Sequence, residues 1–407
     1  MPRPEPSDEP LGRLQQQPAD ALLAIMGAYR ADARTTKIDL GVGVYRDARG
    51  DTPVLAAVKQ AERLLWDHQP TKAYLAPEGD AVFLRLLISL MFGPDADSSR
   101  IGAVQTPGGT GALRTAGELV ARARPEARLH LGLPTWPNHE PLLAASGLQI
   151  VPYDYFDART QTLLFDNILA AVQTAARGDV LLLHGCCHNP TGADLTPDQW
   201  SVIANAMAER GVLPLIDFAY HGLGKGLAED AIGVRTVVGR CPTVLLAYSC
   251  DKNFGLYRDR VGALFVTAPT PERSQIATSN ILALTRANWS MPPDHGAAIV
   301  RIILQSPELS DLWRQELDAM RSRLNAVRTG LALASPALAP LAKQYGLFCQ
   351  LPLSRSDIAR LQDDDAIYMA GSGRVNLAGL SGDAIGRFSR TIDHILNRST
   401  EVSTHAL

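Results

Sequence analysis

Short apolar runs alternate with helix-like stretches through the middle of the chain. Several of these runs are apolar throughout, which is typical of strands that are covered on both faces. Strand–helix alternation of this kind predicts a mostly parallel sheet in an α/β domain. Helical patterns lie between the runs, for example at residues 111–122 and 197–209. Seven strands are predicted, at residues 101–105, 128–131, 149–153, 180–184, 213–216, 243–248 and 262–266.

The two ends of the chain follow a different pattern. Residues 271–333 have a largely helical pattern, and the tail from Ala342 carries short strands and a final helix. This tail predicts a smaller α+β domain, with which the N-terminal segment up to about Val54 is expected to pack. The predicted division is an N-terminal extension at 1–17, a small domain at 18–54 and 325–407, and a large domain at 55–324. The extension begins MPRPEPSDEP, so we expect it to be disordered or loosely attached and not a signal peptide.

Composition and charge argue against several classes of partner. The chain has 407 residues, of which 46% are hydrophobic and 20% charged, so it can bury a large core. The formal net charge of −3 gives no bulk electrostatic reason to bind nucleic acid or an anionic membrane. No apolar run approaches the roughly 18 residues expected of a membrane span. Five cysteines, two of them adjacent, form no disulfide framework and favour a reducing cytoplasm.

Candidate chemistry follows the predicted strands, as expected when ligands bind beyond the carboxyl ends of such a sheet. After the first strand comes TPGGTGALR. Glycines that open a helix expose backbone N–H groups at its positive end, which suits a phosphate. The same residues could equally form a tight turn and a helix start. They match neither the dinucleotide-binding fingerprint nor the P-loop.

The stretch GCCHNPTG follows the strand at 180–184. A zinc site built from its histidines and cysteines is disfavoured, because adjacent cysteines cannot easily chelate one tetrahedral ion and no second ligand pair follows. We therefore predict no metal site. Asn189 precedes Pro190, which restricts the backbone and holds the Asn189 amide where the strand ends.

Asp217 ends the strand at 213–216. A carboxylate in this position is largely buried and needs a cationic partner. An ordinary structural ion pair with an arginine would satisfy it. Lys225 lies nearby in the glycine-rich stretch GLGKG, but it follows no apolar run and is the weaker candidate for catalysis.

The stretch SCDKNFGLYRDR, at residues 249–260, places Lys252 at the mouth of an apolar strand. A lysine there loses hydration unless something uses its amine. Ser249 and Arg260 supply a hydroxyl and a guanidinium, and together with the glycine-rich helix start they could surround one phosphate. This combination suggests a phosphorylated aldehyde held as a Schiff base on Lys252. That group is pyridoxal 5'-phosphate, whose ring nitrogen needs a carboxylate such as Asp217.

The motifs, taken in order, resemble those of the aspartate and aromatic aminotransferases of the class I aminotransferase family. The resemblance runs from about Pro18 to the C-terminus and implies a fold-type I, pyridoxal-phosphate-dependent enzyme. It is carried by GVGVYRD, TKAYL, QTPGGTGALR, PTWPNHEPLL, LLLHGCCHNPTGADLTPDQW, LIDFAYHG, DKNFGLYRDRVGA, TRANWSMPPDHGA and GSGRVNLAGLS.

The resemblance implies how the cofactor would be held. Lys252 would carry it and shuttle protons, and Asp217 would keep its ring nitrogen protonated. Tyr220 and Asn189 would bond its 3-oxygen, and Trp136 would stack on its ring. Its phosphate would be held by Gly109, Thr110, Ser249 and Arg260, joined by Tyr74 of the partner subunit.

The resemblance also implies a substrate site shared within a homodimer. Arg374 would hold the substrate α-carboxylate as a planar fork, with a backbone contact from Gly43 and further contacts from Trp136 and Asn189. Arg286 of the partner subunit would bind a side-chain carboxylate.

Four positions depart from the family pattern. Asp251 stands beside the lysine where serine is common; this extra carboxylate should favour a protonated Schiff base, or it points to solvent. Gly108 lacks a serine hydroxyl that many relatives aim at the phosphate. Met291 and Ala73 each replace an asparagine, which makes the pocket rim less polar and more adaptable.

These residues predict an aminotransferase that moves an amino group between an L-amino acid and a 2-oxo acid such as 2-oxoglutarate. Arg286 favours aspartate or glutamate, and the less polar rim leaves aromatic amino acids open. The alternatives are a pyridoxal-dependent lyase, β-substituting enzyme or decarboxylase on the same scaffold. A cofactor-free binding protein is a third possibility, which the intact Lys252, Asp217 and Arg260 disfavour.

Overall fold

The computed structural model describes residues 11–17 and 21–404. The proline-rich stretch at residues 1–10, which we expect to be disordered, lies outside the described residues. Within the predicted N-terminal extension, the side chains of Leu11 and Leu14 are largely exposed.

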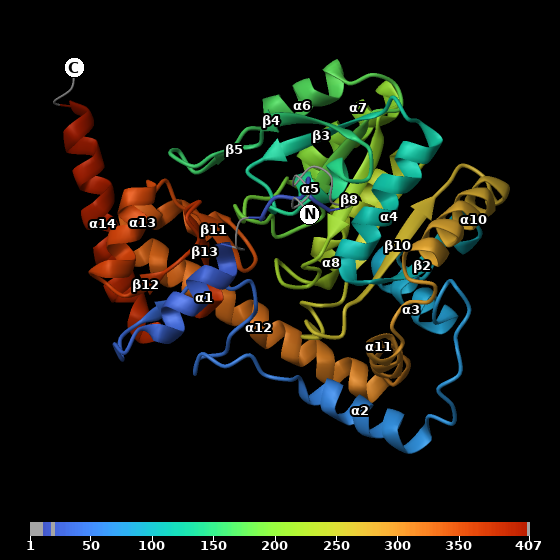
Figure 1. Ribbon diagram of the computed structural model, residues 1–407, viewed down its shortest axis with the longest axis horizontal. Coiled ribbons are helices and arrows are strands. Elements are labelled where there is room, and N and C mark those ends of the chain that lie inside the picture. Colours follow the sequence, from blue (N-terminus) through green and yellow to red (C-terminus); the bar gives the residue numbers. More distant parts are fainter. Residues whose placement is uncertain (1–10, 18–20, 405–407) are drawn as a thin grey trace, which may run out of the picture.

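A seven-stranded sheet forms the centre of the larger part of the molecule (Figure 1). Strand β10 runs antiparallel to both of its neighbours, and all other neighbouring pairs are parallel. All seven predicted strands are present, so the prediction of a mostly parallel α/β sheet is confirmed. The order across the sheet is β2 (Ile101–Pro107), β10 (Val261–Thr267), β9 (Val244–Ser249), β8 (Leu213–Phe218), β7 (Val180–His184), β3 (Arg128–Leu133) and β4 (Gln149–Asp154).

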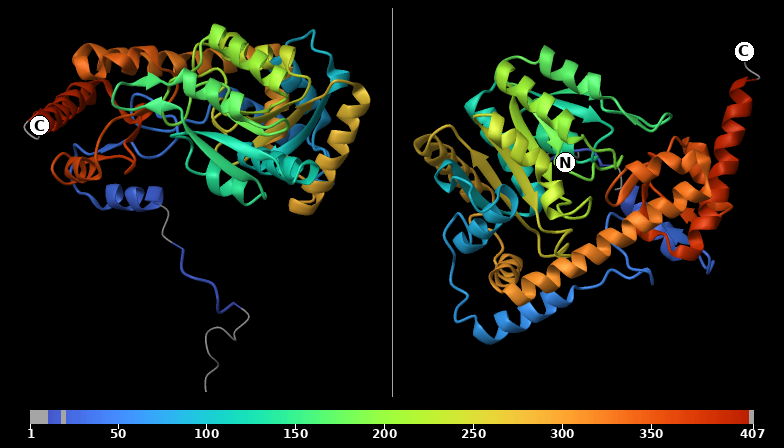
Figure 2. Two further views of the ribbon diagram at one scale, coloured as in Figure 1. Left: turned by 90° about the horizontal axis from the view of Figure 1, so that it is seen from above. Right: turned by 180° about the vertical axis from the view of Figure 1, so that it is seen from behind.

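Helices cover both faces of this sheet (Figures 1 and 2). Alternate residues of the central strands enter two separate cores: Leu246 and Tyr248 of β9 pack into one, and Leu245 and Ala247 pack into the other. This two-sided burial explains why the strands are apolar throughout. The helices are α2 (Ala56–His68), α3 (Ala81–Phe92), α4 (Gly108–Ala123), α5 (His139–Ala144), α6 (Phe165–Thr174), α7 (Pro197–Arg210), α8 (Leu227–Asp230), α9 (Ile232–Arg240), α10 (Pro271–Asn288) and α11 (His295–Gln305). A short hairpin pairs β5 (Phe156–Asp157) with β6 (Thr162–Leu163).

The two ends of the chain meet in a smaller part with its own core. Strand β1 (Ile38–Asp39) pairs in parallel with β12 (Ile367–Tyr368), and β11 (Phe348–Gln350) pairs antiparallel with β13 (Arg374–Asn376). The remaining helices here are α1 (Ala21–Ala31), α13 (Arg355–Asp363) and α14 (Gly382–Thr404). Two 3-10 turns of this part span Pro336–Lys343 and Leu377–Gly379. A further 3-10 turn, Ser98–Arg100, lies in the larger part and precedes β2.

The long helix α12 (Pro307–Ala334) connects the two parts, and it lies beside α2 along the lower edge of Figure 1. Its buried residues up to Leu324 join the core beneath the sheet, whereas Val327 and Leu331 join the core of the smaller part. This change of core supports the predicted domain division near residue 324, which stays a prediction.

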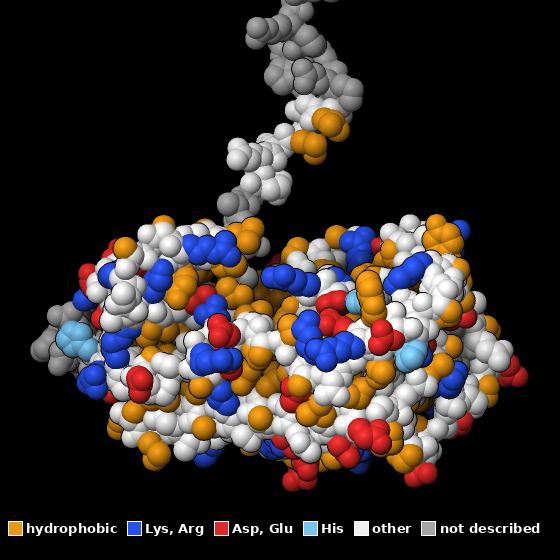
Figure 3. Space-filling model, turned by 90° about the horizontal axis from the view of Figure 1, so that it is seen from below, with side chains coloured by type: hydrophobic (Ala, Val, Ile, Leu, Met, Phe, Trp, Pro, Cys, Tyr) orange, Lys and Arg blue, Asp and Glu red, His pale blue; other side chains and the backbone are white. Residues whose placement is uncertain are grey.

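The distribution of charged side chains on the surface and the character of the helices agree with what the composition predicts. Basic and acidic side chains are interspersed over the face seen in Figure 3. Among the described residues, no helix combines the length and the apolar character needed to cross a membrane.

Candidate active site

A cavity of about 350 Å³ lies at the carboxyl ends of β7, β8 and β9, between the two parts of the chain. It is lined by every predicted site residue except two. Those that line it are Gly43, Gly109, Thr110, Trp136, Asn189, Asp217, Tyr220, Ser249, Lys252, Arg260 and Arg374. Residues far apart in the sequence meet here because parallel strands end at the same edge of the sheet.

One end of the cavity has the geometry of an anion-binding site. Helix α4 begins at Gly108, three residues before its predicted start, and its N-cap, Pro107, offers no side-chain hydrogen bond. The first N–H groups of a helix have no partner within the helix, so they are available to a ligand. A Cβ atom on Gly109 would lie 3.2 Å from Cβ of Ser249, so glycine keeps the hydroxyl close to the helix start. Arg260 lines the same end.

Asp217 is buried, and its partner is a histidine and not the arginine of the simple ion-pair interpretation. His139 Nε2 lies 3.0 Å from Asp217 Oδ2. Burial raises the pKa of Asp217, but the hydrogen bond and charge of His139, with smaller effects from His184 and Lys252, hold it below the usual value. Asp217 therefore stays ionised inside the cavity.

His139 was missed by the sequence reasoning, although it lies within the quoted stretch PTWPNHEPLL. It follows no predicted strand, and a lone histidine carries no pattern of its own. Its Nδ1 atom lies 2.8 Å from Thr135 Oγ1, which lies 3.1 Å from His184 Nε2. Burial and then the neighbouring His139 lower the pKa of His184 to about 3, so His184 is neutral at physiological pH.

Lys252 points into the cavity, with its Nζ atom 5.8 Å from the centre of the Tyr220 ring. Burial lowers the pKa of its amine, while the carboxylates of Asp251 and Asp217 act in the opposite direction. A lowered pKa increases the fraction of free amine at neutral pH. The Nζ atom of Lys225, in contrast, lies 4.7 Å from the centre of the Tyr345 ring, and Lys225 is not among the cavity's lining residues.

Asn189 and Tyr220 face each other in the same cavity. Asn189 Nδ2 donates a hydrogen bond of 3.4 Å to Tyr220 Oη, and Asn189 Oδ1 is buried without a protein partner. Burial and the charge of Asp217 raise the pKa of Tyr220, so its hydroxyl remains a hydrogen-bond donor. Both side chains therefore keep polar capacity for a ligand.

Arg374 enters from the smaller part of the chain. Its Nη2 atom donates to Gly41 O at 2.9 Å, its guanidinium carbon lies 4.8 Å from the centre of the Phe348 ring, and its Nε atom is buried without a protein partner. Gly43 is close to the same ring, since a Cβ there would lie 3.2 Å from Phe348 Cζ. Phe348 was also missed, because it belongs to a three-residue strand outside the alternating pattern.

Asp251 does not point to solvent, so that alternative is wrong. Its carboxylate is paired with Arg260 and accepts a 3.0 Å hydrogen bond from the N–H group of Val261. Burial raises the pKa of Asp251, while Lys252 and Arg260 act in the opposite direction.

Tyr74 and Arg286 do not line the cavity of their own chain. The Tyr74 side chain is 93% exposed, and Arg286 lies exposed near the end of α10, hydrogen-bonded to Ser290. The two segments are connected through Met291, whose Sδ atom accepts a 3.0 Å hydrogen bond from the N–H group of Leu75. One side chain therefore links the segment that carries Tyr74 with the segment that carries Arg286.

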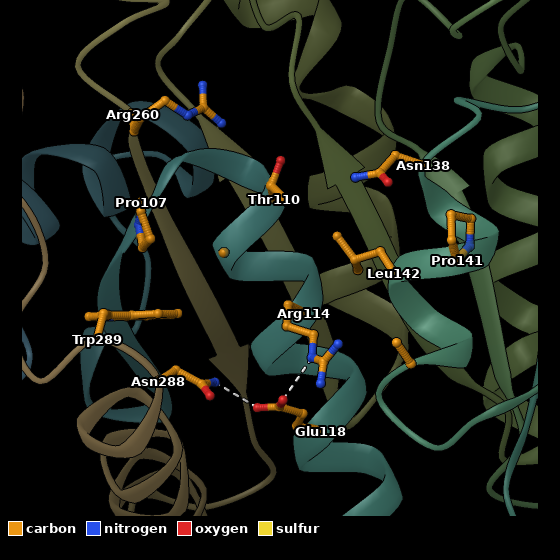
Figure 4. A pocket seen from close by; sticks show the side chains of 12 residues that line it. Pro107, Thr110, Arg114, Glu118, Asn138, Pro141, Leu142, Arg260, Asn288 and Trp289 are labelled. Atoms are coloured by element: carbon orange, nitrogen blue, oxygen red, sulfur yellow. Dashed lines mark hydrogen bonds and ion pairs between the residues drawn. The ribbon is translucent and has the colours of Figure 1, made fainter. Parts of the chain in front are cut away.

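An open hollow of about 610 Å³ adjoins the cavity and shares Thr110 and Arg260 with it. Figure 4 shows both side chains above α4, with Trp289 and Asn288 at the end of α10 on the neighbouring side. Glu118 connects the two helices, because it accepts hydrogen bonds from Arg114 and from Asn288.

The side chains fit pyridoxal 5'-phosphate on two observations. The uncapped start of α4, with Ser249 and Arg260 beside it, provides donors for a phosphate. Asn189 Oδ1 and Arg374 Nε are buried polar atoms without protein partners, as expected where a polar ligand completes their bonding. The cluster Cys186, Cys187 and Asp230 is a poorer fit for a metal, since the Asp230 carboxylate already accepts from the N–H groups of Gly222, Gly224 and Lys225.

Comparisons with known proteins agree with this geometry. The family described as "Aminotransferase class I and II" matches residues 35–392. Tyrosine aminotransferase of Rhizobium meliloti (strain 1021) is 49% identical over 90% of this chain and 95% of its own length. Aromatic-amino-acid aminotransferase of Pseudomonas aeruginosa is 46% identical, covering 94% and 98%. Aspartate aminotransferase of Salmonella typhi is 41% identical, covering 93% and 98%.

Solved structures give the same result. An aromatic amino acid aminotransferase with 3-indolebutyric acid matches with a TM-score of 0.92 and 42% identity, over 95% of this chain and 99% of that one. The aromatic-amino-acid aminotransferase from Burkholderia pseudomallei, covalently bound to pyridoxal phosphate, matches with a TM-score of 0.92 and 34% identity, over 95% and 100%.

Proposed function

The chain belongs to the class I and II aminotransferase family, and from that premise we propose that it transfers amino groups from dicarboxylic and aromatic L-amino acids to 2-oxoglutarate. It is an enzyme of the transaminase type, and its relatives give no support to the lyase, β-substituting or decarboxylase alternative. The substrate classes follow the names of the relatives, which include tyrosine, aromatic-amino-acid and aspartate aminotransferases.

The observation that carries the proposal is the single cavity that holds the amine of Lys252, the ionised Asp217, an anion site at the start of α4 and the guanidinium of Arg374. We propose pyridoxal 5'-phosphate as the cofactor of this cavity. Its phosphate would be bound by Gly109, Thr110, Ser249 and Arg260, and its ring would lie beside Trp136. The bound cofactor supplies an electron sink for the charge that develops on the substrate α-carbon.

Three groups of the chain would act on the substrate directly or through the cofactor. Asp217, oriented by His139, places a negative charge where the cofactor's ring nitrogen needs a counter-ion. Arg374 would fix the α-carboxylate through its free donors, and its contact with Phe348 limits the orientations available to the guanidinium. Lys252 would take a proton from the α-carbon and return it elsewhere, a task for which its lowered pKa suits it.

We further propose a homodimer in which each cavity is completed by Tyr74 and Arg286 of the partner subunit. The exposure of both side chains in the single chain supports this arrangement, and so does Trp66, which is 88% exposed on α2. The open hollow over Thr110 and Arg260 leaves room for a second copy to reach the anion site (Figure 4). All five cysteines are free and buried, which supports a cytoplasmic location.

The experiment is an amino-donor screen with the purified chain and pyridoxal phosphate. Aspartate, glutamate, tyrosine and phenylalanine are each supplied with a 2-oxo acid (2-oxoglutarate, or oxaloacetate for glutamate), and the oxo acid and amino acid formed are both quantified. The expected result is one oxo acid for each amino acid formed, with a Lys252→Ala variant as the inactive control. Release of ammonia without a new amino acid would instead identify a lyase.

A further inference from the structure

Asp251 is a buried carboxylate at a site whose other features favour anions. Its exposed fraction is 1%, and it immediately precedes Lys252 and the loop that leads to Arg260. Its two oxygens have different partners: Oδ1 accepts from the N–H group of Val261 at 3.0 Å, and Oδ2 is paired with Arg260 Nη1. A buried carboxylate with two such partners is fixed in position and does not face solvent.

The Asp251–Arg260 pair lies directly against the start of α4. A Cβ atom built on Gly108 would lie 2.6 Å from Arg260 Nη2 and 3.0 Å from Asp251 Oδ2. The two charged side chains therefore fill the space over the first residue of the helix. Arg260 itself has a φ of 56°, in the left-handed region that few side-chain-bearing residues adopt, so its backbone is also constrained.

These contacts determine the balance of charge between Asp251, Arg260 and the start of α4. The helix start and Arg260 would attract a phosphate dianion. Asp251 places one negative charge in contact with the same guanidinium, so part of that attraction is already offset by the protein. The contact also uses Nη1 and leaves Nη2 facing the helix start, which permits Arg260 to serve both anions because the guanidinium has several donors.

We propose that Asp251 is a built-in counter-ion of Arg260 in the phosphate site. It positions Arg260 over the start of α4 and weakens the affinity of the cavity for the phosphate of its cofactor. The proposal rests on the proposed pyridoxal-phosphate function and adds to it a residue that sets how tightly the cofactor is held. An enzyme with this carboxylate binds phosphate less tightly than the same enzyme with serine or asparagine there.

The test is a binding measurement on the full chain without bound cofactor. Inorganic phosphate is titrated calorimetrically at constant ionic strength into the unmodified protein, Asp251→Asn and Asp251→Ser, and the dissociation constant of pyridoxal phosphate is then measured for each. Asparagine can still accept the hydrogen bond of Val261, and serine removes the charge with less bulk, so one of the two variants remains informative if the other folds poorly. Asp318→Asn is the matched control, since it removes a carboxylate paired with Arg321 on α12.

Both Asp251 variants are expected to bind inorganic phosphate and pyridoxal phosphate at least about tenfold more tightly than the unmodified protein, because a like charge beside the ligand is removed. The Asp318→Asn control should bind both as the unmodified protein does. Equal or weaker binding by the folded Asp251 variants overturns the proposal. If the unmodified protein binds no pyridoxal phosphate at all, the proposed function fails instead, so the two failures are distinguishable.

Discussion

The Nε2 atom of His139 lies 3.0 Å from Oδ2 of Asp217, and both side chains are buried. A consistent set of donors follows if His139 donates from Nε2 to the carboxylate: Thr135 Oγ1 then donates to His139 Nδ1 and accepts from His184 Nε2. The carboxylate is thus oriented by a chain of hydrogen-bonded side chains that runs from His184 through Thr135 to His139. In this arrangement the charge at Asp217 is preserved for the cofactor ring.

Removal of this orienting histidine should reduce activity while the fold persists. His139→Ala deletes a hydrogen bond to a charged group, worth roughly 1.5–3 kcal/mol, so kcat/KM should fall by about 10- to 100-fold. His139→Asn is the matched control, because the asparagine amide can still donate toward Asp217. Its kcat/KM should fall by less than that of His139→Ala. Steady-state kinetics with cofactor in excess gives the comparison; equal activity of His139→Ala and the unmodified enzyme contradicts the role.

Lys252, and not Lys225, should carry the cofactor. Reduction of the pyridoxal-phosphate-loaded enzyme with borohydride, followed by peptide mapping, is expected to place the pyridoxyl group on the peptide containing Lys252. Lys225→Ala should keep at least about half of the activity, since its Nζ atom lies over Tyr345 and Lys225 does not line the cavity. Label on the Lys225 peptide is the outcome that rejects this assignment.

The burial of Lys252 also predicts a pH-dependent stability. Its pKa in the folded chain is lowered by burial, so the unfolded chain binds the proton more tightly. Stability is therefore reduced at pH values below 10.5, the ordinary pKa of a lysine amine, and the penalty disappears as the pH rises toward that value. Without cofactor, Lys252→Met should melt at a higher temperature than the unmodified chain at pH 7, and the difference should shrink at pH 10. Calorimetry at both pH values provides the measurement, and a difference that grows with pH contradicts it.

The strand pattern predicted the sheet well because each strand is buried on both faces. Leu245 and Leu246 point into different cores, so no polar position interrupts the run. Asp217 and Lys252 could be found for a related reason, since a charged residue directly after a buried strand stands out. The family motifs supplied the rest of the cavity, including Arg374, which belongs to a three-residue strand.

His139 and Phe348 could not be found in this way. Their importance comes from what they touch, Asp217 in one case and Arg374 in the other, and both contacts join segments far apart in the chain. The environment of Asp251 could not be predicted for the same reason. Only the turn that returns Arg260 to the start of α4 decides between a buried carboxylate paired with Arg260 and a carboxylate that faces solvent.

Complementation between two inactive variants should reveal a shared site. Lys252→Ala lacks the amine but keeps Arg286, and Arg286→Asp lacks the substrate guanidinium but keeps the amine. In a hybrid dimer, one cavity receives both native residues, so equal mixing should restore about a quarter of the unmodified dicarboxylate activity. Refolding the two variants together, with each refolded alone as the control, gives the test. Full activity of a monomer in solution would refute the shared cavity.

The substrate preference depends on the balance between Arg286 and Met291. A guanidinium that pairs with a substrate carboxylate in a closed pocket contributes roughly 1.5–3 kcal/mol, or about 10- to 100-fold in rate. A methionine contact with an aromatic ring contributes only about 0.3–1.5 kcal/mol. The contribution of Met291 to ring binding is further limited because its sulfur already accepts a hydrogen bond from Leu75.

The arginine should therefore dominate, and aspartate or glutamate should be a better substrate than phenylalanine, with phenylalanine still measurable. Arg286→Leu should lower kcat/KM for the dicarboxylates by about 10- to 100-fold and leave phenylalanine nearly unchanged, because Arg374 still holds the α-carboxylate. Arg286→Lys is the matched control, since it keeps the charge without the planar fork and should fall between the two. The measurement is kcat/KM for aspartate, glutamate and phenylalanine on all three proteins. If the unmodified enzyme prefers phenylalanine and Arg286→Leu changes nothing, then Arg286 does not bind a substrate carboxylate, and the less polar rim around Met291 determines the preference instead.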